Sequence, residues 1–457
     1  MLSSAASDVH PLLYYLAAKL FLDAVRLFVT PSPETCVVLL RLFSVLPMCV
    51  LSLLGYTHVR RYMGERCGLL FTLFVGFAPS TYYLGLQIRM YSWAALWVFC
   101  AFLFAWRLAT EQRQGSGAKS RFLWAGLAAF SLLAAYTHYY ALAAAVFIQL
   151  GLLIFLLHTQ RGSKASALVP WFLTVLGQLL LYLPGFFLFY RQTSAVSDGY
   201  WIQIQYPDIL EEIASFFVEG ALPRSLALPA GILLLTAIFF LLVLRLPRES
   251  TPFRAAIFLC LLPPVGVCAA GLGISLIRPL FIPRYLFPMS GLFWLLPALL
   301  LSSLRRPWPA TVMAVLLLSL GLKNAAVRHA AMTSPENDGW KAAIASQRQE
   351  GDAFFFSDMN VGCQPAVFFP SAPLYFQNQF HWSNKNGLMG FSSMTFVEDG
   401  GQLDALLPSG NRLWIIDSQN SDLAAALPDS FSCLHPKSSY FHPYSGQWIT
   451  LSLWLKT

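Results

Sequence analysis

Short polar segments, separated by long apolar stretches, carry the side chains that could perform chemistry. They bring together carboxylate, imidazole, guanidinium, phenol and amide groups: Asp8-Val9-His10-Pro11, Gln87-Ile88-Arg89-Met90-Tyr91, Tyr136-Thr137-His138-Tyr139-Tyr140, Arg278 and Arg284-Tyr285. Arginine presents a planar set of donors that fits phosphate oxygens, and tyrosine and histidine add further hydrogen bonds. Asp8 adds a carboxylate to this set. The arginine, histidine and tyrosine side chains indicate a site suited to a phosphate-bearing ligand.

The composition of the chain requires a membrane. Hydrophobic residues make up 57% of the 457 residues and charged residues only 11%, against about 25% charged in a typical soluble domain, and the mean hydropathy is +0.58. So few charges cannot cover a soluble globule of this size, which excludes a soluble enzyme, a disordered chain and a secreted disulfide scaffold. The net charge of +8 comes from short basic clusters between apolar runs. Such clusters are typical of cytoplasmic loops and do not indicate nucleic-acid binding.

Ten apolar runs approach the length of about 20 residues that a membrane-crossing helix needs. They lie near 36–58, 67–86, 90–107, 121–137, 140–158, 168–190, 226–245, 254–276, 285–304 and 310–325. We therefore predict a polytopic α-helical membrane protein, with a transmembrane domain of about ten spans over residues 1–330.

The charges in alternate loops predict the orientation of these spans. Fourteen cations and three acids fall there: Arg60, Arg61, Arg66, Arg107, Arg113, Lys119, Arg121, Arg161, Lys164, Arg245, Arg248, Arg254, Arg305 and Arg306, with Glu65, Glu111 and Glu249. The positive-inside rule makes these loops cytoplasmic. Both ends of the chain then face outward from a plasma (inner) membrane, as an even number of spans allows.

The polar segments described first fall on the outer side of this topology. The hairpins at 87–91 and 136–140 are short, so their tips should lie at one depth and form a cationic rim suited to a lipid phosphate. Taken singly, a tyrosine there could be an aromatic-belt anchor, an arginine a phospholipid contact, and His138 a satisfied interfacial group. If the segments converge on one site, a ligand-binding role is favoured over these single-residue interpretations.

Residues 11–29 form a further apolar stretch, interrupted by Lys19, Asp23 and Arg26. A charge at the centre of a bilayer costs roughly 2.5–3.5 kcal/mol on insertion scales. We interpret the stretch as a helix lying in the outer interface, and the alternative is a poor first span.

The character of the chain changes after residue 330. Polar residues return, and short β-rich runs appear at 353–356, 366–369, 413–416 and 448–451, with a helical pattern at 338–349. We predict that 331–457 is a small extracytoplasmic α/β domain. Of eight cysteines, only Cys363 and Cys433 fall in it, where they could pair. No spacing suggests a metal site, and we expect no cofactor.

The ordered set of motifs resembles a known superfamily. Asp-x-His-Pro-Leu-Leu-Tyr-Tyr at 8–15, Gln-x-Arg-Met-Tyr at 87–91, Tyr-Thr-His-Tyr at 136–139, Tyr-Trp at 200–201, Arg-Tyr-Leu at 284–286 and Asp-Gly-Trp-Lys at 338–341 follow one another. Together they resemble bacterial polytopic glycosyltransferases of the GT-C superfamily, relatives of protein O-mannosyltransferases and lipid A aminoarabinose transferases.

The resemblance implies transfer of a sugar from a polyprenyl-phosphate donor to a lipid, glycan or protein acceptor on the exported face, with inversion. It implies a carboxylate base, for which Asp8 is the candidate, with His10 orienting it or contacting the acceptor. Arg89, Tyr91 and Arg284 would hold the donor phosphate, with Tyr285 beside them. Gln87, His138 and Tyr139 would shape the sugar site. A lipid phosphate leaves readily once cations stabilise its charge, so no nucleotide-binding loop is needed.

One feature departs from the superfamily. Its members usually begin with a further span that ends in an acidic pair carrying the principal catalytic acid. Here only seven residues precede Asp8. We therefore expect that this span is missing from the sequence, or that the chain is a degenerate paralogue.

Two other functions remain open. A multispan lipid or glycan transporter or flippase would bury ionisable groups near the bilayer midplane, and the apolar runs hold almost none. A catalytically dead paralogue that binds a glycan would not need the absent acid.

Overall fold

The structure is a computed structural model. It describes residues 10–111, 118–159, 165–195, 206–216, 218, 222–358, 361, 365, 368–369, 371–377, 394–418, 422–442 and 447–457. The chain divides into two compact units. The helical unit comprises Val9–Gln192 and Ile202–Ala325, and the α/β unit comprises Ala326–Thr457 with Met1–Asp8 and Thr193–Trp201.

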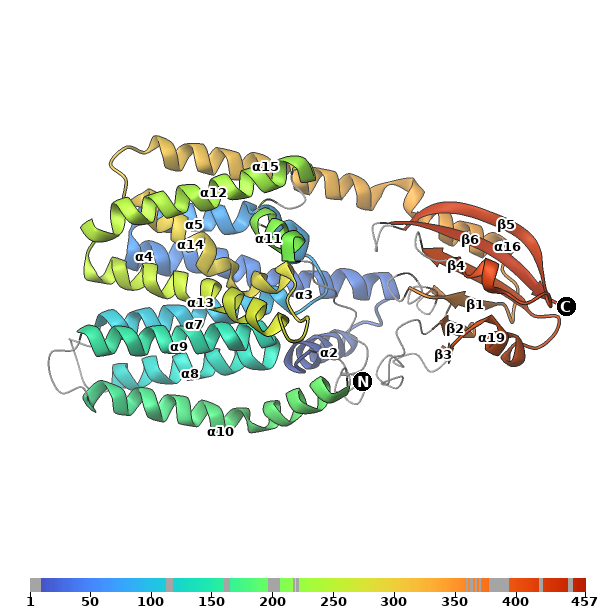
Figure 1. The fold of residues 1–457 in the computed structure, drawn as a ribbon, viewed down its shortest axis with the longest axis horizontal. Coiled ribbons are helices and arrows are strands. Elements are labelled where there is room, and N and C mark those ends of the chain that lie inside the picture. The colour runs from blue at the N-terminus through green and yellow to red at the C-terminus, as the bar shows by residue number, and fades with distance from the viewer. Residues whose placement is uncertain are drawn as a thin grey trace. The chain divides into compact units, whose positions relative to one another are not determined.

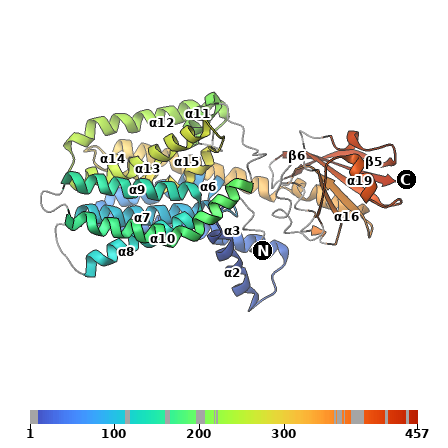
Figure 2. The same cartoon turned by 60° about the horizontal axis from the view of Figure 1, so that its bottom comes forward.

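Long helices lying side by side build the helical unit (Figures 1 and 2). In chain order they are α2 (Leu13–Arg26), α3 (Pro33–Leu54), a π-helical turn (Gly55–Val59), α4 (Arg60–Met63), α5 (Glu65–Phe77), α6 (Pro79–Leu84), α7 (Tyr91–Glu111), α8 (Ala118–Thr137), α9 (Tyr139–Thr159), α10 (Ala165–Ala195), α11 (Tyr206–Ser215), α12 (Arg224–Arg245), α13 (Thr251–Ser275), the 3₁₀ segment η4 (Pro283–Met289), α14 (Ser290–Ser302) and α15 (Trp308–Thr333).

Eight of the described helical segments are long and apolar enough to cross a membrane, which confirms a polytopic helical fold. The predicted run at 121–137 falls within α8, but the prediction of one span over 67–86 is wrong. Ala78 adopts φ −57° and ψ 132° and ends α5, because the proline that follows disfavours helical dihedrals at the preceding residue. Asn324 donates a hydrogen bond of 3.1 Å to the carbonyl of Pro79, which satisfies one acceptor at this break.

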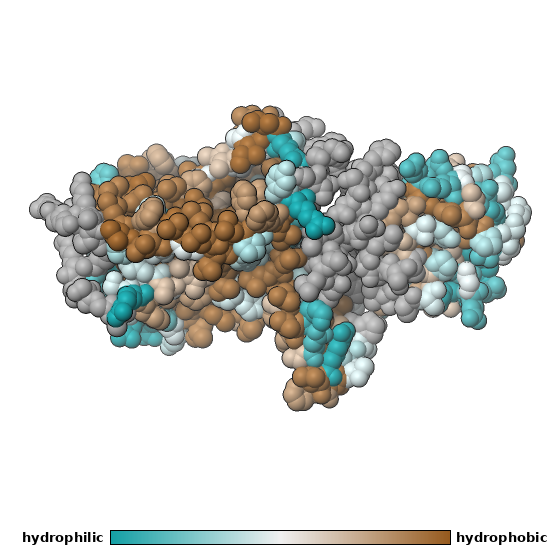
Figure 3. Space-filling view, turned by 90° about the horizontal axis from the view of Figure 1, so that it is seen from below, coloured by the Kyte–Doolittle hydropathy of each residue, from teal (hydrophilic) through white to brown (hydrophobic). Residues whose placement is uncertain are grey.

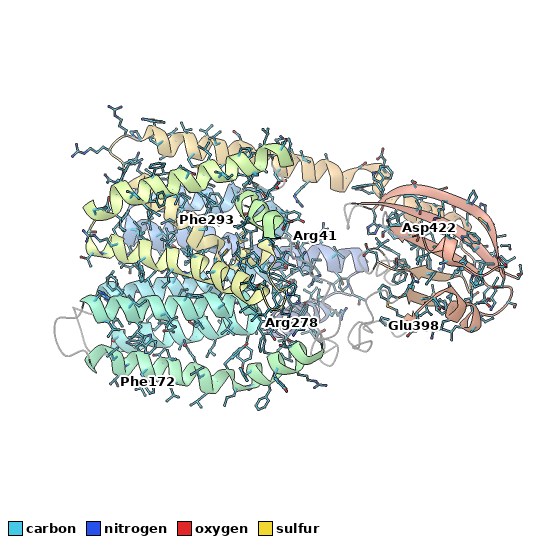
Figure 4. All side chains as sticks on the ribbon, in the orientation of Figure 1. Arg41, Phe172, Arg278, Phe293, Glu398 and Asp422 are labelled. Atoms are coloured by element: carbon cyan, nitrogen blue, oxygen red, sulfur yellow. The ribbon has the colours of Figure 1, made fainter. Side chains whose placement is uncertain are left out.

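The helices differ sharply in burial. Within Pro283–Ser302, which joins η4 to α14, 94% of the most apolar window is buried, against 6% within Leu168–Thr193 of α10. Phe172 is 58% exposed and lies on the outer side of α10 (Figure 4). Apolar residues cover most of the helical surface seen in Figure 3, as expected where lipid replaces water. α14 is thus the central element that carries η4.

The predicted cytoplasmic loops contact one another at one end of the helical unit. Arg66 donates to the carbonyl of Leu304 at 3.0 Å, and Arg245 donates to Ser303 Oγ at 3.0 Å. Arg107 pairs with Glu111, which also pairs with Lys119. We call this the cationic end.

The segment predicted as an interfacial helix forms α2. Its 14 residues span about 21 Å at 1.5 Å per residue, less than the hydrocarbon thickness of about 30 Å. The charges form one cluster, in which Asp23 pairs with Lys19 and Arg26, while Leu20 on the same helix is 58% exposed. The length argues against a first span, and the interfacial position stays a prediction.

The α/β unit contains one six-stranded sheet with helices on both faces. Its strands are β1 (Ala353–Phe356), β2 (Leu374–Gln377), β3 (Met394–Val397), β4 (Arg412–Ser418), β5 (Phe431–His442) and β6 (Gln447–Lys456), in the order β3-β2-β1-β4-β6-β5. β1 to β4 are parallel, and β6 pairs antiparallel with β4 and β5. Phe354 and Phe356 pack with α16 (Gly339–Gln347), whereas Phe355 packs with α19 (Gly400–Leu406). The alternation follows from the twofold repeat of a strand.

The predictions for this unit are confirmed in part. β1, β4, β6 and α16 coincide with predicted runs. The predicted strand over 366–369 is not seen at its two described residues, because Phe368 is helical and Phe369 lies in a bend. Positions 366 and 367 lie outside the described residues. Cys363 also lies outside them, and Cys433 is an exposed free cysteine on β5.

Candidate functional site

Polar side chains gather around His138 at the end of the helical unit where α8 meets α9. The His138 ring centroid lies 5.5 Å from that of Tyr91, 5.4 Å from that of Tyr285 and 6.2 Å from that of His10. Tyr140 completes the surround, with its ring centroid at 5.9 Å from that of His138. Segments distant in sequence therefore meet at one histidine, and we call these five residues the His138 cluster.

Helix boundaries place these residues. Tyr91 is the first residue of α7, Tyr285 lies in η4, and His138 stands alone between α8 and α9. The hydroxyl of Tyr140 donates to the carbonyl of Leu280 at 3.0 Å, which ties α9 to the turn after α13.

That turn is itself fixed by Ser275, the last residue of α13. Its hydroxyl oxygen accepts hydrogen bonds from the backbone amides of Leu280 and Phe281, at 3.2 and 3.1 Å. Gly271 allows the close approach, because a Cβ there would lie 2.7 Å from the Phe281 ring and 3.3 Å from the Tyr140 ring. η4 is thereby held beside α9.

Arginines accompany this cluster. Arg284 is half-buried, and its guanidinium carbon lies 5.9 Å from the centroid of the Tyr285 ring. Arg89, which is exposed, and Arg284 both interact electrostatically with Tyr91. Arg41 on α3 and Arg278 after α13 lie at the same end of the helical unit (Figure 4). The predicted phosphate-binding arginines thus share a neighbourhood with the aromatic residues.

His138 is neutral in this environment. Burial lowers the pKa of His138 well below 6.5, and proximity to His10 and Arg284 lowers it further. Its Nδ1 accepts a hydrogen bond of 3.1 Å from the backbone amide of Tyr140. An accepting Nδ1 carries no proton, so the proton of the neutral ring is on Nε2.

Sequence reasoning missed Gln192, which lies near the end of α10 and is 4% exposed. Tyr139 donates its hydroxyl hydrogen bond to the Gln192 side-chain oxygen, and Gln192 Nε2 donates to the backbone carbonyl of His10 at 3.0 Å. One amide therefore joins α9, α10 and the segment before α2. The one signal in the sequence is that Gln192 follows shortly after the apolar run 168–190.

Some of the predicted residues are not among those that the structure describes. Asp8, Tyr200 and Trp201 lie outside the described residues. Among the described contacts, none links the side chain of Gln87 to the cluster; its carbonyl accepts a hydrogen bond of 2.7 Å from the amide of Arg89 and shapes that turn.

Glu211 is a half-buried acid on α11, which packs against η4, the segment of Arg284. Among the described residues, no group of three or more histidine, cysteine or acidic side chains is arranged to hold a metal ion.

A bundle of apolar helices that gathers histidine, tyrosine and arginine at one end, with a small mixed-sheet unit, defines a polytopic membrane protein with a GT-C-like fold. The chain is similar to the crystal structure of ArnT from Cupriavidus metallidurans in the apo state, with a TM-score of 0.59 and 14% identity over 90% of this chain and 83% of that one. At this identity the likeness shows the fold.

Two further solved structures match with TM-scores below 0.5 and support no separate conclusion. ArnT from Cupriavidus metallidurans bound to undecaprenyl phosphate has a TM-score of 0.37 and 12% identity, over 97% of this chain and 87% of that one. The second is the oligosaccharyltransferase AglB from Archaeoglobus fulgidus, in complex with an inhibitory peptide and a dolichol-phosphate. It has a TM-score of 0.43 and 11% identity, over 96% of this chain and 66% of that one. No protein-family model and no curated protein matches the chain.

Proposed function

We propose that this protein is a membrane glycosyltransferase that moves a sugar from a polyprenyl-phosphate donor to an acceptor on the exported face of the membrane. The observation that carries the proposal is the meeting of Tyr91, His138 and Tyr285 with Arg89 and Arg284 at one end of an apolar bundle. A lipid-linked phosphate matches this arrangement, because its tail requires the bilayer and its charge requires cations.

In the proposed reaction, the protein supplies a base and stabilises the leaving phosphate. Asp8 takes the proton of the acceptor hydroxyl, and the acceptor oxygen attacks the anomeric carbon from the face opposite the phosphate. The bond from that carbon to the phosphate oxygen breaks with inversion, and its electron pair leaves on the polyprenyl phosphate. Arg89 and Arg284 stabilise the charge that develops there, with Tyr91 and Tyr285 alongside. His10 orients Asp8 or the acceptor.

The proposal draws support from the fold and from the motifs. ArnT from Cupriavidus metallidurans in the apo state shares the fold. The resemblance to GT-C glycosyltransferases rests on independent grounds, since it uses motif order and not coordinates. We further propose that residues 331–457 are extracytoplasmic and help to position the acceptor, which is a lipid, glycan or protein.

Replacing Arg89 by alanine tests the proposal. Arg89 is exposed on its turn, so the variant should fold, and we expect it to lose transfer from a panel of undecaprenyl-phosphate-linked sugars. Arg306→Ala is the matched control, because Arg306 is an exposed arginine in the loop between α14 and α15. Full activity of the Arg89→Ala protein would refute the assignment.

A further inference from the structure

His138 has one ring nitrogen with a partner and one without. Nδ1 accepts the amide hydrogen of Tyr140 at 3.1 Å. Nε2 is buried and has no hydrogen-bond partner within the part of the chain that the structure describes. The whole residue is only 2% exposed. A buried donor left without a partner has lost its hydrogen bonds to water without replacement, so this position favours a bound acceptor.

The surroundings of His138 narrow the identity of that acceptor. Aromatic rings of Tyr91, Tyr140 and Tyr285 surround the imidazole. These tyrosines are titratable groups but carry no positive charge. Among the described residues, proximity to Arg284 and His10 disfavours a positive charge on His138. A neutral N–H donor beside an arginine suits an anionic oxygen. The oxygen accepts a hydrogen bond from the imidazole and is also attracted by the guanidinium, and no second cation has to be buried.

We propose that His138 binds a phosphate oxygen of the polyprenyl donor by donating a hydrogen bond from Nε2, as a neutral imidazole in a fixed tautomer. The inference rests on the proposed function and specifies one contact within it. Tyr140 then acts as a positioning residue, because its amide holds the Nε2–H tautomer and its hydroxyl anchors α9 to Leu280.

Two amide substitutions separate the ring nitrogens. The amide of glutamine reaches about as far as Nε2 and can supply the lost N–H, whereas the shorter amide of asparagine lies near the position of Nδ1. His138→Phe keeps the ring volume and removes both nitrogens. The purified full chain of each variant, in nanodiscs, would be titrated with undecaprenyl phosphate, and with undecaprenol as the uncharged control, by native mass spectrometry.

We expect His138→Asn and His138→Phe to bind undecaprenyl phosphate roughly 10- to 100-fold more weakly, as for loss of a hydrogen bond to a charged acceptor. His138→Gln should stay within about threefold of the wild type. The ratio of wild-type to His138→Gln affinity should not change between pH 6.5 and 8, since burial lowers the pKa of His138 well below 6.5 and an amide does not titrate. Undecaprenol should bind all four proteins equally.

Four results would overturn the inference. If His138→Gln loses as much affinity as His138→Phe at equal thermal stability, the donor role is wrong. If no variant loses affinity, or if the ratio changes between pH 6.5 and 8, His138 does not act as a neutral phosphate ligand. If the wild type prefers undecaprenyl phosphate and transfers sugar, these results leave the proposed function intact. A wild type that does not distinguish the phosphate from the alcohol refutes both.

Discussion

Replacing Gln192 by leucine should slow transfer without unfolding the protein. Gln192 accepts from the hydroxyl of Tyr139 and donates to the carbonyl of His10, and its side chain is buried. Leucine has a similar size and makes neither bond. The substitution should therefore release the backbone of His10, two residues after the proposed base Asp8, from α9 and α10.

The expected size of the effect follows from the two bonds. A net hydrogen bond contributes about 1 kcal/mol, and a factor of ten in rate corresponds to about 1.36 kcal/mol. Loss of both bonds gives about 2 kcal/mol, or roughly a 30-fold lower kcat. KM for the lipid donor should change little, because the arginines that hold the phosphate are untouched. Tyr139→Phe removes one bond and should cost roughly fivefold.

The measurement is steady-state transfer from a lipid-linked sugar in nanodiscs, with thermal unfolding recorded in parallel. Gln178→Leu is the matched control, since Gln178 lies on the same helix and accepts a hydrogen bond of 3.2 Å from Gln149 away from the cluster. The double variant of Tyr139 and Gln192 should be no slower than Gln192→Leu alone, because the two share one bond. Equal losses in Gln178→Leu, or a change confined to KM, would refute the positioning role.

Three further predictions concern stability. Ser275→Ala should lower the free energy of unfolding by about 1–3 kcal/mol, measured by denaturation in detergent, because two backbone amides lose their acceptor. Asp352→Ala should destabilise the α/β unit by about 3–5 kcal/mol in the same assay, because a buried carboxylate that Trp414 and Arg412 contact is removed. Burial lowers the pKa of His442 to about 4, below the ordinary value of 6.5. The unfolded chain then takes up the proton first, so up to about 3 kcal/mol of stability is present above pH 6.5 and is lost as the pH falls toward 4; His442→Gln should remove that slope in a pH series of thermal melts.

The gathering of Arg89, Tyr91, His138 and Tyr285 at one end of the bundle could be predicted from the sequence. Short hairpins between apolar helices leave their tips at a common level, and the cations in alternate loops show which tips share a side. The same reasoning predicts that the loops rich in arginine and lysine share the other side of the membrane. They form the cationic end, where Arg66 donates a hydrogen bond to the carbonyl of Leu304.

The contacts that bind the tips together could not be predicted. The hydroxyl of Tyr140 reaches a carbonyl 140 residues later in the chain, and Gln192 reaches one 182 residues earlier. Hydrophobic periodicity reports which face of a helix is apolar, and contains no information about which distant carbonyl a single polar side chain meets. β5 was missed for a different physical reason. It pairs only with β6 at the edge of the sheet and is exposed along most of its length, so its sequence lacks the apolar run that identifies a buried strand.

The two ends of the helical unit hold arginine in different described surroundings. At the cationic end, Arg107 and Arg245 each pair with a glutamate one turn later on the same helix. Near His138, Arg284 lies against the Tyr285 ring, and an aromatic face stabilises a nearby cation. The same neighbourhood holds the buried Nε2–H of His138, which has no acceptor among the described residues. A guanidinium and an imidazole N–H in one place can both donate to the oxygens of a phosphate.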